Sequence, residues 1–480
     1  MSSNPSIGAQ SLRDYTGKIR HLDAARAREL VTLFHRPITA TGLSARCDSL
    51  DSVAAATQGD ASLVQSAAGE ARGVVGHYAT HLYLHEVIRL PLSVARQLSA
   101  HRGHLYLDKL TTITDTVAAE LGRHRGGGLS LNNLRRLSSA AALSLGRHEG
   151  ELSLNRLRQL DDAVALGLAQ HANQLHLWGL RRLTPSAAAA LSHHRGDLFL
   201  EGLTRLPGRV AAHLARYSGK LHLHGISHLK EAAARALGLR NGFLCLNGLK
   251  SLSPTEAELL SAHRGPLYLN KVELTDAVVH TLGQHHGSLS LSPPWGITDH
   301  HLASLIQHVG PLSLGGLKNV SQRTAAILAS QQAPRGIAGL SGLHVNDVTH
   351  ITPPVAAMLA THQAGELSLS GITLLTEETA RELVRHPLLT LDGVTSMTDR
   401  VAGILASHEG GSLSLRGLRH VSPSGLATLR LNPGISLPRR LQDDTAGSTD
   451  ATVPPLPSRD DMIAIIDRIA RAGEKALNVE

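Results

Sequence analysis

The most conspicuous candidates for chemistry in this sequence are histidines that return at one place in a repeating unit. The chain has 480 residues and 30 histidines, and eleven of the histidines occupy this place. Imidazoles stacked in neighbouring units could bind a metal ion or respond to pH. No column of carboxylates or thiolates accompanies them, however, and an imidazole near a helix end can bond the last carbonyls of that helix. We therefore expect a structural column that holds no metal and no cofactor, formed by His101, His124, His148, His171, His194, His263, His285, His308, His362, His386 and His408.

A second group of candidates is aromatic. Five of the chain's eleven aromatic residues stand next to inward-pointing leucines, with histidines at matching places, whereas later units carry residues such as Ser290, Ser313 and Ser368 there. Exposed aromatic side chains often anchor protein interfaces, although rings on adjacent strands can also stack simply for stability. The expected partner-binding residues are Tyr83, Tyr106, Trp178, Phe199, Tyr268, His176 and His222.

Arginines follow the same segments. Arginine beside aromatic rings suits carboxylate or phosphate ligands and also single-stranded nucleic acid. Arginine outnumbers lysine 39 to 8 over the whole chain, so the pattern also fits a general bias on a solvated edge. The candidates are Arg135, Arg136, Arg158, Arg181, Arg182 and Arg205.

Composition limits the remaining classes of function. We find no phosphate-binding loop, dinucleotide fingerprint, HExxH motif or nucleophile elbow, so we expect no catalytic residue. Cys47 and Cys245 are the only cysteines, which predicts neither a disulfide framework nor a thiolate metal site and favours a reducing, cytoplasmic setting. The sequence shows no secretory signal and no apolar stretch long enough to cross a membrane. The net charge of +8 favours acidic partners.

The elements that would position these residues come from one unit that returns about every 23 residues. Its anchor is a Leu-x-Leu pair, seen for example at Leu244 and Leu246, whose alternation of apolar and polar residues predicts a short strand. The first residues of the pairs are Leu82, Leu105, Leu129, Leu152, Leu175, Leu198, Leu221, Leu244, Leu267, Leu289, Leu312, Leu343, Leu367, Leu389 and Leu413, with a partial copy at Ile435. Such units cannot bury their apolar faces alone and must stack.

A helix should follow each strand. Ser253-Pro254-Thr255-Glu256 combines an N-cap, a first-turn proline and a capping-box glutamate. Thr184-Pro185, Thr352-Pro353 and Ser422-Pro423 repeat the signal, and Gly196, Gly265 and Gly287 stand where a helix of about ten residues should end. Each unit is therefore expected to form strand, turn, helix and turn.

This pattern resembles the bacterial leucine-rich-repeat family, most closely the variety with Leu-x-Leu-x-Gly-Leu-x-x-Leu-Ser/Thr and an alanine-rich helix. The resemblance covers about three quarters of the chain and implies an α/β solenoid of about 23-residue units. Gly179, Gly202 and Gly248, each followed by leucine, stand near the place where the commonest signature has an asparagine. The family resemblance further implies binding on the strand face and no catalytic residue.

The division that we expect is a disordered start with degenerate capping repeats over residues 1–81, a solenoid over 82–437, a flexible linker over 438–459 and an amphipathic helix over 460–480. That helix could cap the solenoid or dock to another chain. The interval between Leu312 and Leu343 is longer than the others, and the additional residues near Gly336 predict a surface loop.

Together these observations predict a non-enzymatic scaffold that binds an unidentified, acidic protein on its strand face between about Leu82 and Leu269. Nucleic acid or another polyanion, bound through the arginines, remains the alternative.

Overall fold

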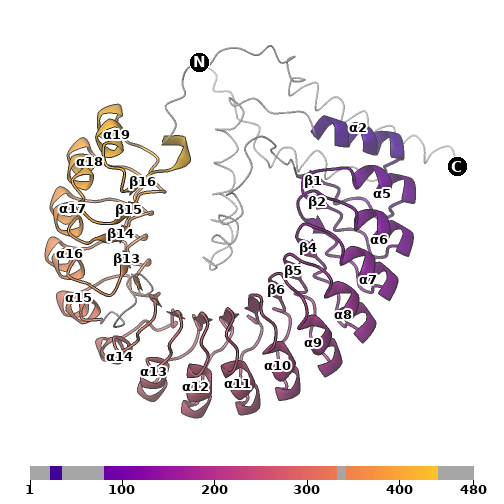
Figure 1. Ribbon diagram of the computed structural model, residues 1–480, viewed down its shortest axis with the longest axis horizontal. Helices are drawn as coiled ribbons and strands as arrows, with labels where there is room; N and C mark the ends of the chain where they lie inside the picture. Colours follow the sequence, from indigo (N-terminus) through magenta and orange to yellow (C-terminus); the bar gives the residue numbers. More distant parts are fainter. Residues whose placement is uncertain (1–21, 35–80, 332–341, 442–480) are drawn as a thin grey trace. The chain divides into compact units, whose positions relative to one another are not determined.

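The computed structural model describes residues 22–34, 81–331 and 342–441. These residues fall into two compact units, divided between Leu200 and Glu201. In both, a short strand and a helix alternate along the chain (Figure 1). The fold is therefore an α/β leucine-rich-repeat solenoid with units of about 23 residues, as the sequence predicts.

In the first unit, parallel strands pair in chain order, with the leucines of neighbouring repeats opposite each other. Helix α2 packs against α5, and Arg28 Nε donates to Gln97 Oε1 at 3.1 Å. The strands are β1 (Leu82–Tyr83), β2 (Leu105–Tyr106), β3 (Leu129–Ser130), β4 (Leu152–Ser153), β5 (Leu175–His176) and β6 (Leu198–Phe199). The helices are α2 (Ala24–Phe34), α5 (Leu92–Leu98), α6 (Asp115–Leu121), α7 (Ser139–Leu145), α8 (Asp162–Leu168) and α9 (Pro185–Leu191).

The second unit has the same parallel pairing in chain order. Its strands are β7 (Leu221–His222), β8 (Leu244–Cys245), β9 (Leu267–Tyr268), β10 (Leu289–Leu291), β11 (Leu312–Leu314), β12 (Gly342–His344), β13 (Glu366–Ser368), β14 (Leu388–Thr390), β15 (Ser412–Ser414) and β16 (Ile435–Ser436). Its helices are α10 (Gly208–Leu214), α11 (Glu231–Gly238), α12 (Pro254–Ser261), α13 (Asp276–Leu282), α14 (Asp299–Leu305), α15 (Gln322–Ala329), α16 (Pro353–Leu359), α17 (Glu377–Leu383), α18 (Asp399–Ala406) and α19 (Pro423–Arg430), followed by the 3₁₀ turn η2 (Arg439–Leu441).

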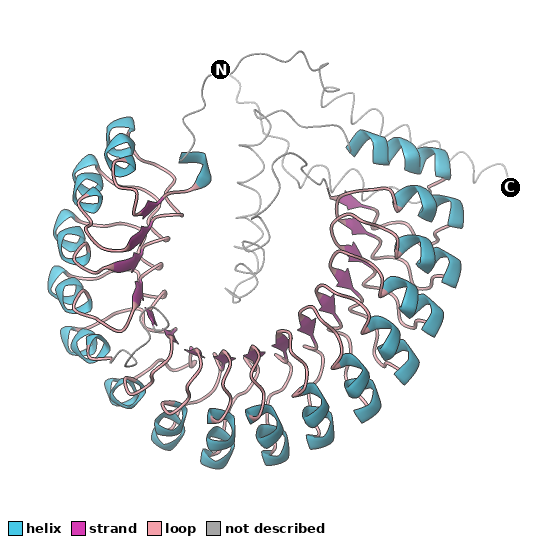
Figure 2. Cartoon of the chain, viewed as in Figure 1, coloured by secondary structure: helices cyan, strands magenta, loops and turns pink. Residues whose placement is uncertain are grey.

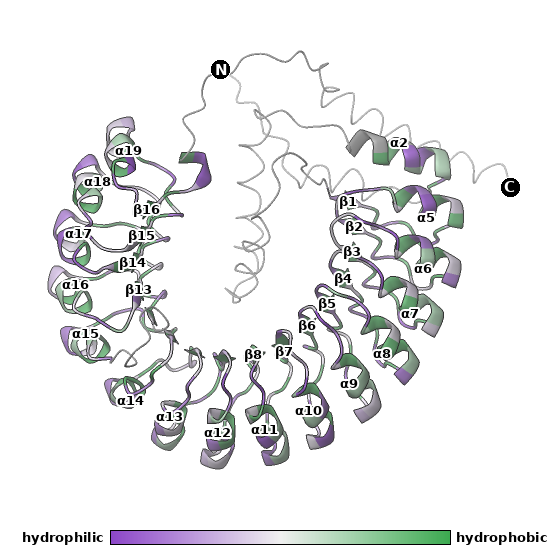
Figure 3. Ribbon diagram, viewed as in Figure 1, coloured by the Kyte–Doolittle hydropathy of each residue, from purple (hydrophilic) through white to green (hydrophobic). Residues whose placement is uncertain are grey.

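The core of each unit lies between its strands and its helices (Figure 2). Leu244, Leu246 and Leu249 are fully buried and Leu252 nearly so, as the pattern predicts. Hydrophobic residues lie on the helix sides that face the strands (Figure 3). Because successive strand residues point to opposite sides, the residue between the two leucines of each pair points away from the helices. We call this side the strand face.

The helices begin as predicted but are shorter. Ser253 and Glu256 form the capping box, and the Thr184 and Ser422 side chains cap α9 and α19, whereas the Thr352 side chain makes no capping hydrogen bond. Apart from α2, the helices span seven or eight residues rather than about ten. The glycines expected at their ends lie several residues later, because the chain first turns through the histidine column, with His194 N–H bonded to Leu191 O at 3.0 Å.

The histidine column is buried between neighbouring repeats. All eleven imidazoles are at most 4% exposed. His148 Nδ1 donates to His124 O at 2.8 Å, and His408 Nε2 donates to His386 O at 2.9 Å. These bonds reach the carbonyl of the preceding repeat rather than the end of the same helix, and so they tie successive repeats together.

Among the described residues, other polar residues replace histidine at four places of the column. Arg240 donates to the carbonyls of Leu214 (3.2 Å), Tyr217 and Gly219. Gln331 Nε2 donates to His308 O at 3.3 Å, and Asn432 Nδ2 donates to His408 O at 2.8 Å, while the fourth replacement, Tyr217, is also buried. With the exception of Tyr217, the replacements share one property with histidine, a side-chain N–H that satisfies a buried carbonyl.

Burial of the column controls its charge. Desolvation, together with the charges of neighbouring imidazoles, lowers the pKa of His171, His263 and His308 to about 4. These side chains are therefore neutral at pH 7 and can donate a single N–H to the backbone.

Several predicted segments lie outside the described residues: the start of the chain, most of the degenerate repeats before residue 81, the insertion near Gly336, residues 442–459 of the linker and the helix at 460–480. The division at 82 and 437 therefore stays a prediction. None of the described helices has the length and apolar character needed to cross a bilayer.

Candidate functional site

Stacked rings cover the start of the strand face in the first unit. Tyr83 and Tyr106 are opposite each other in the register of β1 and β2, and their rings stack with centroids 4.5 Å apart and an angle of 12°. His104 also stacks on Tyr106, with ring centroids 4.8 Å apart. Burial raises the pKa of Tyr106 above its ordinary value, so its phenol stays a neutral hydrogen-bonding group. The two tyrosines are partly exposed and form the tyrosine cluster.

A second ring cluster lies at β5 and β6. His176 stacks on Phe199 at 4.1 Å, and the Trp178 indole meets His176 edge-on at 5.6 Å. Trp178 is 41% exposed, as its position predicts. Phe199 is only 2% exposed and His176 only 5%, so the expected exposure of these two residues is wrong. Adjacent strands lie less than 5 Å apart, and rings on them therefore cover each other.

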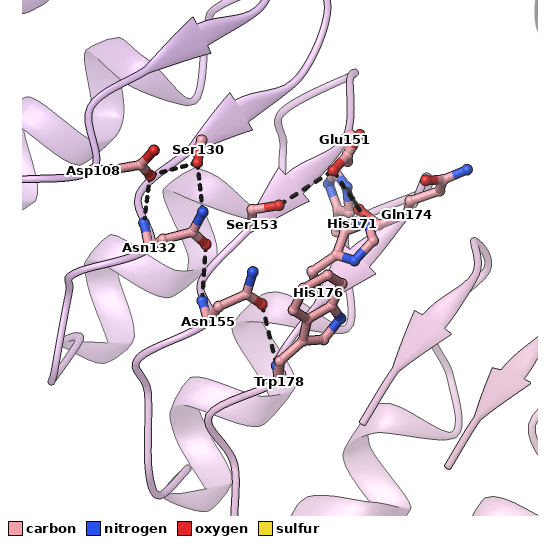
Figure 4. A network of polar contacts seen from close by, with 10 residues as sticks. All are labelled: Asp108, Ser130, Asn132, Glu151, Ser153, Asn155, His171, Gln174, His176 and Trp178. Atoms are coloured by element: carbon pink, nitrogen blue, oxygen red, sulfur yellow. Dashed lines mark hydrogen bonds and ion pairs between the residues drawn. The ribbon is translucent and has the colours of Figure 1, made fainter. Parts of the chain in front are cut away.

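A ladder of side-chain oxygens runs beside these rings (Figure 4). Asp108 Oδ1 accepts from the backbone N–H of Asn132, Asn132 Oδ1 from that of Asn155, and Asn155 Oδ1 from that of Trp178, each at 3.2 Å. Asn155 and Trp178 occupy equivalent places in successive repeats, and Gly179 follows Trp178. The oxygen ladder therefore stands one residue before the glycine that some repeats carry in this turn. Its last hydrogen bond fixes the backbone N–H of Trp178, the residue with the exposed indole.

Carboxylates alternate with the rings on the same face. Glu151 Oε1 lies 3.1 Å from His176 Nε2, and Asp108 Oδ2 lies 3.4 Å from His85 Nδ1. Burial alone would raise the pKa of Glu151, but the hydrogen bond and charge of His176 lower it to about 2. The strand face of the first unit thus combines aromatic surface with anionic groups.

The strand face of the second unit gathers different chemistry. His222, Cys245 and Tyr268 are in register on β7, β8 and β9. His222 is 6% exposed, so its expected exposure is wrong, because the Phe243 ring packs 5.1 Å from it. Phe243 also lies 4.8 Å from the partly exposed Tyr268.

His224 connects two groups of this second face. Its Nε2 lies 2.8 Å from Cys245 Sγ, and its Nδ1 lies 3.2 Å from Glu201 Oε1. Burial alone would lower the pKa of His224, but the hydrogen bonds to Cys245 and Glu201 raise it to about 10. The arrangement favours a protonated imidazole between a thiol and a carboxylate.

The arginines line one edge of the strand face. Those of the first unit stand at equivalent turns of successive repeats and are exposed, and Arg205 in the second unit is exposed as well. Within the part of the chain that the structure describes, no carboxylate pairs with their guanidinium groups. The arginine edge of the first unit comprises Arg135, Arg136, Arg158, Arg181 and Arg182.

Two features were not expected from the sequence. One is the oxygen ladder with the carboxylates Asp108 and Glu151. The other is the group of Glu201, His224 and Cys245. A usable signal for the second was present, since Leu-His-Leu-His at Leu221 and Leu-Cys-Leu at Leu244 are one repeat apart and must come into register.

Among the comparisons with known proteins, only that with solved structures finds similar proteins. No family model matches the sequence, and no curated protein matches it. A leucine-rich-repeat protein of Leptospira interrogans is similar, with 19% identity and a TM-score of 0.36, over 73% of this chain and 93% of that one. A second similar structure is the Toll–Spatzle complex of Drosophila, with 16% identity and a TM-score of 0.32, over 73% of this chain and 53% of that one.

Proposed function

We propose that this protein is a non-enzymatic scaffold that binds a protein partner on the strand face of its first unit. The observation that carries the proposal is Trp178, an indole that is 41% exposed and yet held in place from two sides. The buried His176 ring supports it edge-on, and Asn155 fixes its backbone N–H.

An exposed side chain that is already ordered is well suited to binding. A partner that covers the Trp178 indole gains its burial without the cost of immobilising it first. Tryptophan, tyrosine and arginine dominate the energetics of protein interfaces. The strand face offers all three, in Trp178, in the tyrosine cluster and in the neighbouring Arg181 and Arg182.

The charges support an acidic protein rather than nucleic acid. The arginine edge attracts acidic side chains, and the chain carries a net charge of +8. A phosphate backbone laid along the strand face would, however, meet the carboxylates of Asp108 and Glu151. A protein partner can place its basic or neutral groups there and its acidic groups at the edge. The free thiol of Cys245 fits a reducing compartment such as the cytoplasm.

The test compares the chain's two tryptophans. Trp178→Ser removes the proposed anchor, and Trp295→Ser removes the other exposed indole, which lies on a turn of the second unit and is 87% exposed. Partners captured by the native protein are identified, purified and titrated against both variants. We expect Trp178→Ser to weaken binding at least tenfold, about 1.4 kcal/mol, and Trp295→Ser to leave the dissociation constant unchanged.

Equal affinity of the native protein and the Trp178→Ser variant would contradict the proposal. Loss of captured partners after nuclease treatment, with affinity falling steeply as salt rises, would instead support the polyanion alternative.

A further inference from the structure

We propose that His222, His224 and Cys245 on the strand face of the second unit form a binding site for a zinc ion. This site is separate from the partner surface and does not depend on the proposed function.

The geometry of the three side chains carries the inference. One potential ligand atom from each residue lies within 4.8 Å of the other two. Ligands of a tetrahedral zinc ion are at about 2.3 Å for sulfur and about 2.1 Å for nitrogen, so sulfur and nitrogen ligands are about 3.6 Å apart and two nitrogens about 3.4 Å apart. The contact of His224 Nε2 with Cys245 Sγ, at 2.8 Å, is shorter than the sulfur–nitrogen value by less than an ångström, and all three ligand atoms lie within 4.8 Å of one another. Displacements of the ligand atoms by about an ångström, through small changes of the side-chain torsion angles, would complete the coordination.

The backbone supports this arrangement. His222 and Cys245 are register partners on adjacent strands, and His224 lies two residues after His222, in the turn that follows β7. The two ligands on paired strands are held more precisely than residues on loops would be. The ion would be bound without rearrangement of the fold.

The donor set indicates which metal fits. One thiolate and two imidazoles are ligands typical of zinc, whereas calcium and magnesium prefer oxygen ligands. The chain supplies three ligands, so the fourth position is open to water or to a side chain of a bound molecule. His224 and Glu201 are the partly exposed members of the group, with side chains 17% and 22% exposed, and mark the side from which the ion would enter.

Glu201 supplies the outer contact that such sites require. A histidine ligand normally donates its second N–H to a carboxylate, which orients the ring and increases its basicity. His224 directs Nε2 to Cys245 and Nδ1 to Glu201 Oε1 at 3.2 Å. The ion would therefore replace the proton on Nε2 and that of the Cys245 thiol, both of which leave to solvent, while Nδ1–H would donate to Glu201. Glu201 is therefore a positioning residue of the proposed site.

The experiment uses the full chain, purified without a histidine tag and treated with a chelator. Cobalt(II) is titrated in first, since a thiolate ligand gives a charge-transfer band in the near ultraviolet, and zinc is then added in competition with a chromophoric chelator. We expect one equivalent of cobalt to produce the band and one equivalent of zinc to abolish it. Cys47→Ser, which removes the chain's other cysteine, is the matched control and should behave like the native protein.

Three variants test the individual roles. Cys245→Ser should abolish the cobalt band, and His224→Asn should weaken zinc binding more than 100-fold. Glu201→Gln should keep the band and weaken zinc binding about 10- to 100-fold, the usual effect of removing an outer carboxylate. Circular dichroism melting in excess chelator shows whether each variant folds, and Glu201→Gln decides the question if Cys245→Ser does not fold.

The proposal is overturned if the native protein gives no cobalt band, or if a folded Cys245→Ser variant binds zinc as tightly as the Cys47→Ser control. The second result would mean that zinc binds to surface histidines elsewhere. Equal zinc affinity of the Glu201→Gln variant and the native protein would also overturn the proposal, because zinc would then not be bound through His224.

Discussion

Acidification should unfold this protein through its buried histidine column, and His171 allows the effect to be isolated. His171→Gln replaces an imidazole that is fully buried. Glutamine already occupies the column at Gln331, where its Nε2 donates to the preceding repeat's His308 O at 3.3 Å. The variant should therefore keep the fold at neutral pH while losing one group that can be protonated.

The magnitude follows from the pKa of His171, which desolvation and the neighbouring imidazoles His194 and His148 lower from 6.5 to about 4. Between these two values the unfolded chain binds a proton that the folded chain does not, so stability is complete above about pH 6.5 and is lost as the pH falls toward 4. At about 1.36 kcal/mol per pKa unit, His171 alone should destabilise the fold by ~2 kcal/mol when the pH falls from 7.5 to 5. His263, His308 and His362, with pKa values lowered to about 4, should add to this loss.

The measurement is urea unfolding at pH 7.5 and pH 5, followed by Trp178 fluorescence in a Trp295→Phe background. Trp178 lies in the next repeat, seven residues after His171, and reports the unfolding of this part of the first unit. We expect the stability difference between the two pH values to shrink by ~2 kcal/mol in His171→Gln, and to stay unchanged in the control His193→Gln, whose imidazole is exposed. The same pH dependence in His171→Gln and the native protein would refute the view that the column is neutral and buried.

Two further predictions concern packing. Phe199→Ser should lower the free energy of unfolding by about 3 kcal/mol, since Phe199 is 2% exposed and stacks on His176. Trp178→Ser should lower it by less than about 1 kcal/mol. Equal effects of the two variants in chemical unfolding would show that the two rings have the same surroundings. Arg240→Met should lower the free energy of unfolding by roughly 3 kcal/mol, because it leaves buried carbonyls without donors. Arg240→His should recover most of that loss in the same chemical unfolding experiment. If it does not, Arg240 is not equivalent to the histidines of the column.

Much of the fold follows from the sequence because the repeat is strongly periodic. The Leu-x-Leu pairs locate the start of each described strand to within one residue, and Ser253-Pro254-Thr255-Glu256 determines where a helix begins, since these signals act within a few residues. Helix length is less predictable from the sequence. The chain leaves each helix early to bring the column side chain under the carbonyls of the preceding repeat, and that hydrogen bond involves residues about 23 positions apart, as for His148 and His124.

The candidate site is predictable only in part, for a related reason. Strand alternation correctly places Trp178 on the outside, but it gives the direction of a side chain and not its coverage by neighbours. Phe199 and His176 point to the same face and are nevertheless buried against each other. The pairing of His224 with Cys245 needs both the register of two strands and the rotamers of two side chains, and the sequence supplies only the register.

Oxidative footprinting of the purified complex with the captured partner tests the central claim most directly. Hydroxyl radicals modify exposed aromatic side chains, and the two exposed indoles belong to different units, Trp178 on the strand face of the first and Trp295 on a turn of the second. If the partner binds the strand face of the first unit, modification of Trp178, Tyr83 and Tyr106 should fall several-fold in the complex while that of Trp295 stays the same. Unchanged modification of Trp178 in a saturated complex would contradict the account and place the binding surface elsewhere on the protein.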